Sequence, residues 1–293
     1  MLIGVPSEIK EQESRVGLTP ASVKELINHG HSVIVEHNAG YGAGFDNSSY
    51  EHVGAKIAGI ASDVFNDSEM IIKVKEPLLN EVEMLRDNQI LFTYLHLAAA
   101  AELTAALMKS KAVCIAYETV TDENNKLPLL APMSAVAGRM SIQAGAHSLE
   151  KTQKGRGLLL GGAPGVNPAN VLILGGGVVG ENAADIATGM KAEVTILDKS
   201  EQRLKELQHK FGKLITPHLI DDIDLKELIK KCDLLVGGVL VPGANAPKII
   251  SKEMIGLMRR GSVIVDVAID QGGCVATSKP TTHAHPTYLV DEV

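Results

Sequence analysis

The feature that most restricts the fold of this chain is the regular alternation of short apolar runs with helix-like segments. One such segment is "TPASVKELINHG", in which Thr19 suits a helix cap, Pro20 the first helical position and Gly30 the end. This alternation predicts parallel sheets that are covered by helices on both faces. The strands expected in the first half are rich in branched or aromatic residues: "LIGV" (2–5), "SVIVE" (32–36), "MIIKV" (70–74), "ILFTY" (90–94) and "AVCIAY" (112–117).

The second half repeats the pattern with runs that are almost wholly apolar, as expected where both faces of a sheet are buried. Between the halves, residues 132–155 have helical spacing with Ser134 as the expected N-cap, and a Gly/Pro-rich stretch follows. We therefore predict two doubly wound α/β domains, residues 1–130 and 131–293, with the active site in the cleft between them. The strands expected in the second half are "ANVLILG" (169–175), "AEVTILD" (192–198), "CDLLVGG" (232–238) and "GSVIVDV" (261–267).

Composition and charge argue against several classes of function. Of the 293 residues, 45% are hydrophobic and 22% charged, which is usual for a soluble globular protein with room for two domains. The net charge of −7 and the lack of a basic block argue against a nucleic-acid partner. Cys114, Cys232 and Cys274 are far apart and odd in number, which argues against a disulfide framework or a zinc site and fits a reducing compartment. The N-terminus does not resemble a signal peptide, and no apolar run is long enough to span a membrane, so we expect a soluble cytoplasmic protein.

The strongest motif of the second half is Gly175-x-Gly177-x-x-Gly180, which directly follows an expected strand and opens an expected helix. In dinucleotide-binding domains these glycines permit a tight turn, close approach of a pyrophosphate, and packing of the helix on the strand. The helix N-terminus then offers free N–H groups to the phosphates. Because the flanking elements match, the motif predicts a dinucleotide site rather than an ordinary turn.

The next expected strand ends on Asp198, which stands at about the expected 20 residues from the glycines. A carboxylate there accepts hydrogen bonds from ribose hydroxyls and repels a 2′-phosphate, which favours NAD over NADP. Lys199 and Arg203 weaken this preference, since a nearby cation tolerates the phosphate.

A second acid, Asp270, is expected to end the strand of "VDVAIDQGGC", at the sheet edge where doubly wound domains bind ligands. It is a candidate for ribose binding or proton transfer, and the alternative is a carboxylate that only caps a turn. His283 and His285 form an H-x-H pair, but without a third ligand in evidence the sequence predicts a loop and no metal.

Three residues of the first half are candidates for substrate chemistry. Arg15 lies in the polar loop before the first helix, Lys75 closes "IIKVKEP", and His96 follows the fourth strand in "TYLHLAAA". Each has an ordinary alternative, as a surface charge, a solvated strand end or a core histidine. Together, a guanidinium for a carboxylate, an amine for a carbonyl or imine, and an imidazole for proton transfer suit hydride transfer at the α-carbon of a small amino or hydroxy acid.

Along its whole length the chain resembles the alanine dehydrogenase/pyridine nucleotide transhydrogenase family. The resemblance is carried by "GVPSEIKEQESRVGLTP", "KVKEP", "TYLHLAAA", "MSAVAGRMSIQAGAHSLEK", "GRGLLLGGAPGVNPANVLILGGGVVGENAA", "VLVPGANAPK" and "VDVAIDQGGC". Within these strings, "RMSIQAGAHSLEK" and "LLGGAPGVNPA" look more like the alanine dehydrogenases than the transhydrogenases.

The resemblance implies roles for residues of both halves. Arg15 and Lys75 would bind pyruvate or alanine, and His96 and Asp270 would exchange protons, with Tyr94 shaping the pocket. Domain 1–130 would then be the substrate/catalytic domain and domain 131–293 the NAD-binding domain. The residues that match the family's cofactor contacts, beyond the three motif glycines, are Ser134, Val178, Val179, Asp198, Arg203, Val239, Leu240, Val267, Ala268, Ile269 and Asp270.

The implied reaction converts L-alanine, NAD and water into pyruvate, ammonium and NADH, in a homohexamer. Members of the family continue beyond "HPTYLVDEV" into a cofactor loop and further helices, so we expect this sequence to represent a shortened form. Two alternatives therefore stay open: the NAD-binding subunit of a transhydrogenase, and a relative that binds NAD without catalysis.

Overall fold

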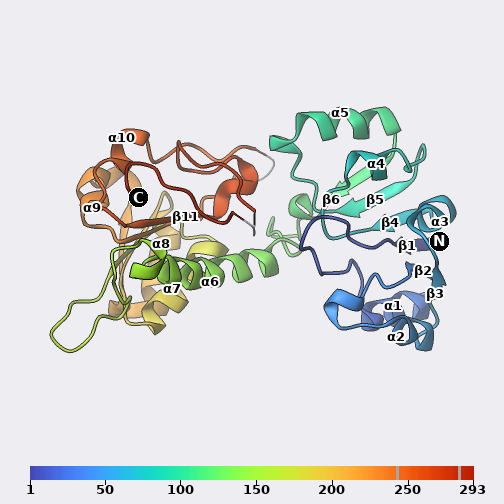
Figure 1. The fold of residues 1–293 in the computed structure, drawn as a ribbon, viewed down its shortest axis with the longest axis horizontal. Helices are drawn as coiled ribbons and strands as arrows, with labels where there is room; N and C mark the ends of the chain where they lie inside the picture. Colours follow the sequence, from blue (N-terminus) through green and yellow to red (C-terminus); the bar gives the residue numbers. More distant parts are fainter. Residues whose placement is uncertain (242–243, 283–284) are drawn as a thin grey trace. The chain divides into compact units, whose positions relative to one another are not determined.

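The computed structural model describes residues 1–241, 244–282 and 285–293, and it divides into two compact units, Met1–Leu129 and Leu130–Val293 (Figure 1). Each unit is built around one sheet, and all the strand pairs in both sheets are parallel. The predicted class of two doubly wound α/β domains is thereby confirmed. In the part of the chain that the structure describes, no helix has both the length and the apolar character that a membrane span needs.

The sheet of the first unit has six strands in the order β3-β2-β1-β4-β5-β6. The first strand lies at the centre, where Ile3 pairs with Val33 on one side and Met70 on the other. Because the pairing is parallel, the loops that follow all six strands leave the same edge of the sheet. The strands are β1 (Leu2–Val5), β2 (Ser32–Glu36), β3 (Lys56–Ala58), β4 (Met70–Ile72), β5 (Ile90–Thr93) and β6 (Val113–Ala116).

Alternating side chains of these strands enter two apolar clusters, one on each face of the sheet. Ile71 and Leu91 pack in one cluster, and Ile3, Val5 and Ile72 pack in the other. Figure 1 shows α4 and α5 on one side of the strands and α1 and α2 on the other. The helices of this unit are α1 (Pro20–Asn28), α2 (Asn47–His52), α3 (Ala61–Asp67), α4 (Leu79–Val82) and α5 (Ala101–Ser110), with short 3-10 turns η1 (Tyr41–Ala43), η2 (Leu97–Ala99) and η3 (Tyr117–Thr119).

The second unit has five strands in the order β11-β10-β7-β8-β9. Its first strand is again central, so the chain extends the sheet first on one side and then on the other. The strands are β7 (Asn170–Leu174), β8 (Glu193–Asp198), β9 (Ile215–Leu219), β10 (Leu234–Gly237) and β11 (Val263–Asp266). Val171 and Ile173 pack in the cluster on one face, and Leu172 and Leu174 in the cluster on the other.

The helices that cover the two faces of this sheet are α6 (Ala131–Ser148), α7 (Val178–Gly189), α8 (Glu201–Phe211), α9 (Leu225–Lys231) and α10 (Lys252–Ile255). Short 3-10 turns complete the unit: η4 (Lys151–Gln153), η5 (Gly212–Leu214), η6 (Ile220–Asp222) and η7 (Val267–Gln271).

Local sequence signals predicted the start of α1 correctly and the start of α6 wrongly. In α1, Thr19 accepts a hydrogen bond from the Ser22 N–H at 3.3 Å and Pro20 is the first helical residue. The N-cap of α6 is Leu130, not Ser134, whose N–H already donates to the Leu130 carbonyl within the helix. The helix starts earlier because Pro132 has no N–H to satisfy and its fixed φ suits the first turn.

The close approach of α6 and α7 gives a prediction about stability. A methyl group at Gly138 would lie 2.3 Å from the Val179 carbonyl oxygen, so Gly138→Ala must separate the two helices. We expect it to reduce the free energy of unfolding by about 1–3 kcal/mol, as overpacking usually does. The matched control is Gly189→Ala at the end of α7, where no atom lies within 4 Å and we expect a change of about 1 kcal/mol or less in the stabilising direction. Calorimetric melting of both variants measures the difference in stability. Equal melting temperatures for Gly138→Ala and Gly189→Ala would contradict the prediction.

Candidate active site

Arg15, Lys75 and His96 lie in loops that leave one edge of the first sheet. Arg15 lies between β1 and α1, Lys75 between β4 and α4, and His96 between β5 and η2. The strands β1, β4 and β5 are neighbours, and β1 and β4 flank the point where the strand order reverses. Loops on the two sides of such a point turn to opposite faces of the sheet and leave room for a ligand. The structure therefore brings the three predicted substrate residues to one edge.

Arg15 is held by a carboxylate of its own loop. Its main-chain N–H and Nε both donate to Glu13 Oε1, at 2.9 and 2.8 Å, and Nη2 pairs with Oε2 at 2.5 Å. These bonds, with a smaller contribution from the nearby ammonium of Lys75, lower the pKa of Glu13 from 4.5 to about 2. The same pairing raises the pKa of Arg15. The guanidinium is thus a permanent and oriented cation.

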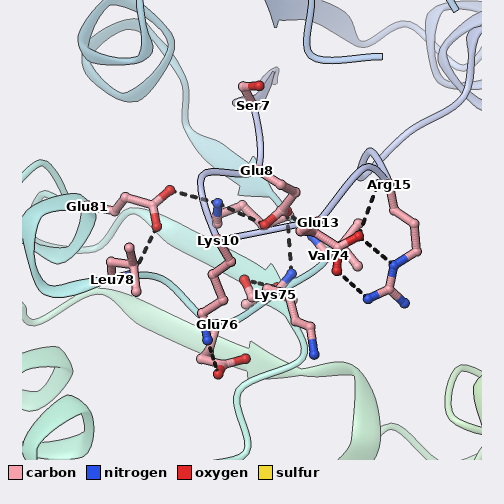
Figure 2. A network of polar contacts seen from close by, with 12 residues as sticks. Ser7, Glu8, Lys10, Glu13, Arg15, Val74, Lys75, Glu76, Leu78 and Glu81 are labelled. Atoms are coloured by element: carbon pink, nitrogen blue, oxygen red, sulfur yellow. Dashed lines mark hydrogen bonds and ion pairs between the residues drawn. The ribbon is translucent and has the colours of Figure 1, made fainter. Parts of the chain in front are cut away.

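Lys75 is fixed through its backbone, and its side chain extends away from the groups that fix it (Figure 2). Its N–H donates to Glu8 Oε1 at 3.4 Å, and its carbonyl accepts a bond from Thr93 Oγ1 at 2.9 Å. Within the described ranges, no hydrogen bond or ion pair of Lys75 Nζ is found. The amine is thus presented on a fixed backbone.

His96 lies in the loop that follows β5. The strand β5 ends at Thr93, and His96 has φ 49° and ψ 36°, a left-handed conformation that a strand cannot contain. The His96 N–H donates to Glu118 Oε1 at 2.7 Å, and the Leu95 N–H donates to the same oxygen at 3.1 Å. Glu118 therefore fixes the turn that presents the imidazole.

Tyr94 packs against the imidazole but does not offer it a proton. The two rings are nearly parallel, with centroids 5.9 Å apart, and Tyr117 meets the Tyr94 ring edge-on at 4.9 Å. The hydroxyl of Tyr94 donates to the Leu129 carbonyl at 2.7 Å, and burial raises its pKa. Tyr94 thus orients the His96 ring and stays protonated.

In the second unit, the predicted glycine motif forms the turn between β7 and α7. Gly175 has φ +94°, and a methyl group on Gly180 would lie 1.8 Å from the Gly175 carbonyl oxygen, so both positions require glycine. Gly177 differs, because a methyl group there would meet no protein atom within 4 Å. No side chain caps α7, so the first N–H groups of the helix stay open. This geometry fits a dinucleotide whose pyrophosphate lies over Gly177.

Two charged side chains hold the middle glycine of this turn. The Gly176 N–H donates to Asp198 Oδ2 at 2.6 Å, and the Gly176 carbonyl accepts from Arg203 Nε at 2.6 Å. The Arg203 guanidinium also forms ion pairs with Glu181 and Glu206. Its charge is therefore balanced by carboxylates.

Other predicted cofactor residues border the same turn. The Gly238 N–H, just after β10, donates to the Leu174 carbonyl at 2.8 Å, so Val239 and Leu240 continue from a point beside the turn. Val178 and Leu240 are each 43% exposed there. Ser134 lies one helical turn before Gly138, which contacts Val179.

The position predicted for Asp270 is wrong in its local structure. The strand β11 ends at Asp266, and Val267, Ala268, Ile269 and Asp270 belong to the 3-10 turn η7. The acid at the strand end is occupied, since Asp266 Oδ2 accepts from the Val275 N–H and from Ser278 Oγ. Asp270 is exposed instead, so its carboxylate is accessible to a ligand.

The H-x-H pair cannot be compared with the structure, because His283 lies outside the described residues. Among the residues that are described, no three His, Cys, Asp or Glu side chains gather in a way that would hold a metal ion.

The carboxylates that position the predicted residues were not predicted from the sequence: Glu8, Glu13, Glu81 and Glu118, and with them the buried Lys73. One local signal was available, because a lysine directly after the apolar run Met70–Ile72 must be paired if it is buried. Glu8 and Glu118, the partners of Lys73 and His96 that come from other loops, are distant in sequence and carry no such signal.

Comparison with known proteins assigns both units to the same family. Residues 4–137 match the model of the alanine dehydrogenase/PNT N-terminal domain, and residues 141–293 that of the C-terminal domain. The alanine dehydrogenase of Halomonas elongata is 56% identical over 294 aligned residues, covering 100% of this chain and 79% of that protein.

The solved structures that resemble the chain include an alanine dehydrogenase and a transhydrogenase. An L-alanine dehydrogenase superposes with a TM-score of 0.90 at 51% identity, covering 100% of this chain and 81% of the other. A transhydrogenase from Sinorhizobium meliloti superposes with a TM-score of 0.79 at 25% identity, covering 95% and 82%. The chain belongs to the alanine dehydrogenase/PNT family.

Proposed function

We propose that this chain is an NAD-dependent L-alanine dehydrogenase, which reversibly converts L-alanine, NAD⁺ and water into pyruvate, ammonium, NADH and a proton. The observation that carries the proposal is the joint position of Arg15, Lys75 and His96 at one sheet edge in a member of this family. Identities of 51% and 56% to proteins called alanine dehydrogenases support the substrate.

Arg15 and Lys75 bind the substrate in this proposal. Arg15 attracts the carboxylate of pyruvate or alanine, and the amine of Lys75 holds the carbonyl or imine. The pairing of Arg15 with Glu13 keeps the guanidinium plane in one orientation before the substrate arrives. Such preorganisation lowers the cost of binding.

His96 and Asp270 carry the protons. His96 takes a proton from the water that attacks the imine carbon. In the reverse reaction, from pyruvate to alanine, it gives the proton back. The hydrogen bond from the His96 N–H to Glu118 and the stacking of the Tyr94 ring hold the imidazole in one place during this exchange. Asp270 is proposed as a second proton-exchanging group.

The glycine turn, Asp198 and the residues after β10 and β11 hold the cofactor. When bound, NAD supplies the hydride acceptor for the α-carbon of alanine. Asp198 accepts from the ribose hydroxyls while its two oxygens also hold Gly176 and Ser200. Glu181 and Glu206 balance Arg203, so a 2′-phosphate would have to compete with them for its guanidinium, and the exposed Lys199 is the other cation next to Asp198.

The transhydrogenase alternative is less well supported, because identity to the solved transhydrogenase is 25% against 51% for the alanine dehydrogenase. Turnover of alanine without a second nucleotide separates the two activities. The cleft location of the site, the homohexamer and the cytoplasmic location stay predictions.

The test of the proposed function is NADH absorbance in the presence of pyruvate and ammonium. We expect NADH consumption that requires both compounds and falls about 10²–10⁴-fold in His96→Ala, because proton transfer loses its group. The control is His209→Ala, which removes an exposed histidine on α8 and should leave the rate unchanged. Binding of NADH without turnover would favour the non-catalytic alternative.

The cofactor site can be tested without turnover. Gly177→Ala adds a methyl group that meets no protein atom, so we expect little change in melting temperature. The methyl group would stand where the pyrophosphate approaches, so the Kd for NADH should rise about tenfold or more. Calorimetric titration measures both this variant and the control Gly189→Ala. Unchanged affinity in Gly177→Ala would place the cofactor elsewhere.

The pairing of Glu13 with Arg15 predicts how stability depends on pH. The pKa of Glu13 is lower in the folded protein, about 2, than its ordinary value of 4.5. The ionised pair therefore stabilises the fold above about pH 4.5, and this contribution is lost as the pH falls toward 2. We expect the difference in melting temperature between the wild type and Glu13→Gln to be largest at pH 5–6 and to disappear near pH 2. Glu11→Gln, an exposed change in the same loop, is the control, and a pH-independent difference for Glu13→Gln would contradict the assignment.

A further inference from the structure

We propose that Glu8 is a positioning residue of the substrate site, which fixes the backbone of Lys75 from within a buried ion triad. The inference rests on the proposed function, because it assumes that Lys75 binds the substrate. Figure 2 shows Glu8, in the loop that leads to Arg15, beside Val74 and Lys75.

The triad consists of Glu8, Lys73 and Glu81, whose side chains are 2%, 1% and 4% exposed. Lys73 Nζ donates to Glu81 Oε1 at 2.7 Å and lies 3.4 Å from Glu8 Oε2. Burial of three charged groups in an apolar domain is costly and is tolerated only with pairing and further hydrogen bonds. A pair of one lysine and one glutamate would balance its own charge, so the second carboxylate requires another explanation.

Main-chain N–H groups supply that explanation. Glu81 Oε2 accepts from the Leu78 N–H at 2.8 Å, which begins α4. Glu8 Oε1 accepts from the Val74 N–H at 2.6 Å and lies 3.4 Å from the Lys75 N–H. Two successive N–H groups that point at one oxygen form an anion-binding bend of the backbone. The carboxylate of Glu8 therefore occupies the inside of the bend that carries Lys75.

The bend is fixed on its other side as well. The carbonyl of Lys75 accepts from Thr93 Oγ1, on the neighbouring strand β5. Lys10, two residues after Glu8, forms an ion pair with Glu76, the residue after Lys75. Two carboxylates thus join the loop after β1 to the segment after β4. Glu8 belongs to the loop and Glu76 belongs to the segment. This docks the loop that continues to Arg15 against the backbone of Lys75.

The test must separate positioning from ordinary stabilisation. Glu8→Asp keeps the charge of the triad but withdraws the oxygen from the two N–H groups by one methylene. Glu8→Gln removes the charge and keeps an acceptor atom. The matched control is Asp233→Asn in the second unit, where a buried carboxylate paired with Arg156 and the Asn170 N–H is neutralised. All three variants are expected to melt at lower temperatures than the wild type.

Two readouts decide the role of Glu8. We expect the KM for pyruvate to rise about tenfold or more in Glu8→Asp and Glu8→Gln, with the Kd for NADH unchanged, since small misplacements of a binding group weaken its effect strongly. Hydrogen–deuterium exchange at Val74 and Lys75 should become faster in Glu8→Asp. Asp233→Asn should change neither readout. If Glu8→Gln does not fold, Glu8→Asp provides both readouts.

The outcomes distinguish this proposal from the proposed function. A raised KM without faster exchange, or faster exchange with an unchanged KM, would overturn the positioning role. If the wild-type protein consumes no NADH with pyruvate and ammonium, the proposed function fails. If hydrogen–deuterium exchange at Val74 and Lys75 is then also unaffected by Glu8→Asp, the hydrogen bonds from Glu8 do not fix the backbone of Lys75.

Discussion

The structure depends on the parallel pairing of strands in both units. Parallel pairing places the loop after every strand at one edge, and in each unit the central first strand makes the connections diverge there. Residues that are distant in sequence, such as Arg15 and His96, reach the same edge for this reason alone. The glycine turn after β7 and the Gly238 segment after β10 meet at the equivalent place of the second sheet. The positions of the candidate site therefore follow from topology, and the chemistry follows from which side chains those loops carry.

A second feature recurs at this edge in both units: a carboxylate from one loop accepts hydrogen bonds from main-chain N–H groups of another. Glu8 holds Val74 and Lys75, Glu118 holds Leu95 and His96, and Asp198 holds Gly176. Charge-assisted bonds to N–H groups are stronger than bonds between neutral groups, and each one fixes backbone rather than a flexible side chain. Loops that present functional groups usually lack the hydrogen bonds of regular structure. Here carboxylates supply those bonds, which allows the loops to be both irregular and rigid.

The sequence predicted the elements whose signals are local. Thr19 and Pro20 defined α1, and Gly175, Gly177 and Gly180 defined the turn before α7, because each acts through the conformation of its own neighbourhood. Two strands, β3 and β9, were not predicted because their local sequence signals are weak. The strand β3 has only three residues, and β9 contains Pro217, which the sheet accepts because β9 is an edge strand. The partners of Lys75 and His96 escaped prediction since Glu8 and Glu118 are 67 and 22 residues away from them, distances that no periodicity spans.

The environment of Arg203 shows how such distant partners change an interpretation. As an isolated cation near Asp198, it would have weakened the preference for NAD. In the folded unit its Nε is used by the Gly176 carbonyl and its charge by Glu181 and Glu206. Glu181 also pairs with Lys210 at 2.6 Å. The two carboxylates and the two cations therefore form one ion-pair network. In the proposed NAD site, a 2′-phosphate that bound Arg203 would have to break these pairs and would also have to approach Asp198. The guanidinium thus contributes to the shape of the glycine turn, and in the proposed site Asp198 is the residue that meets the ribose.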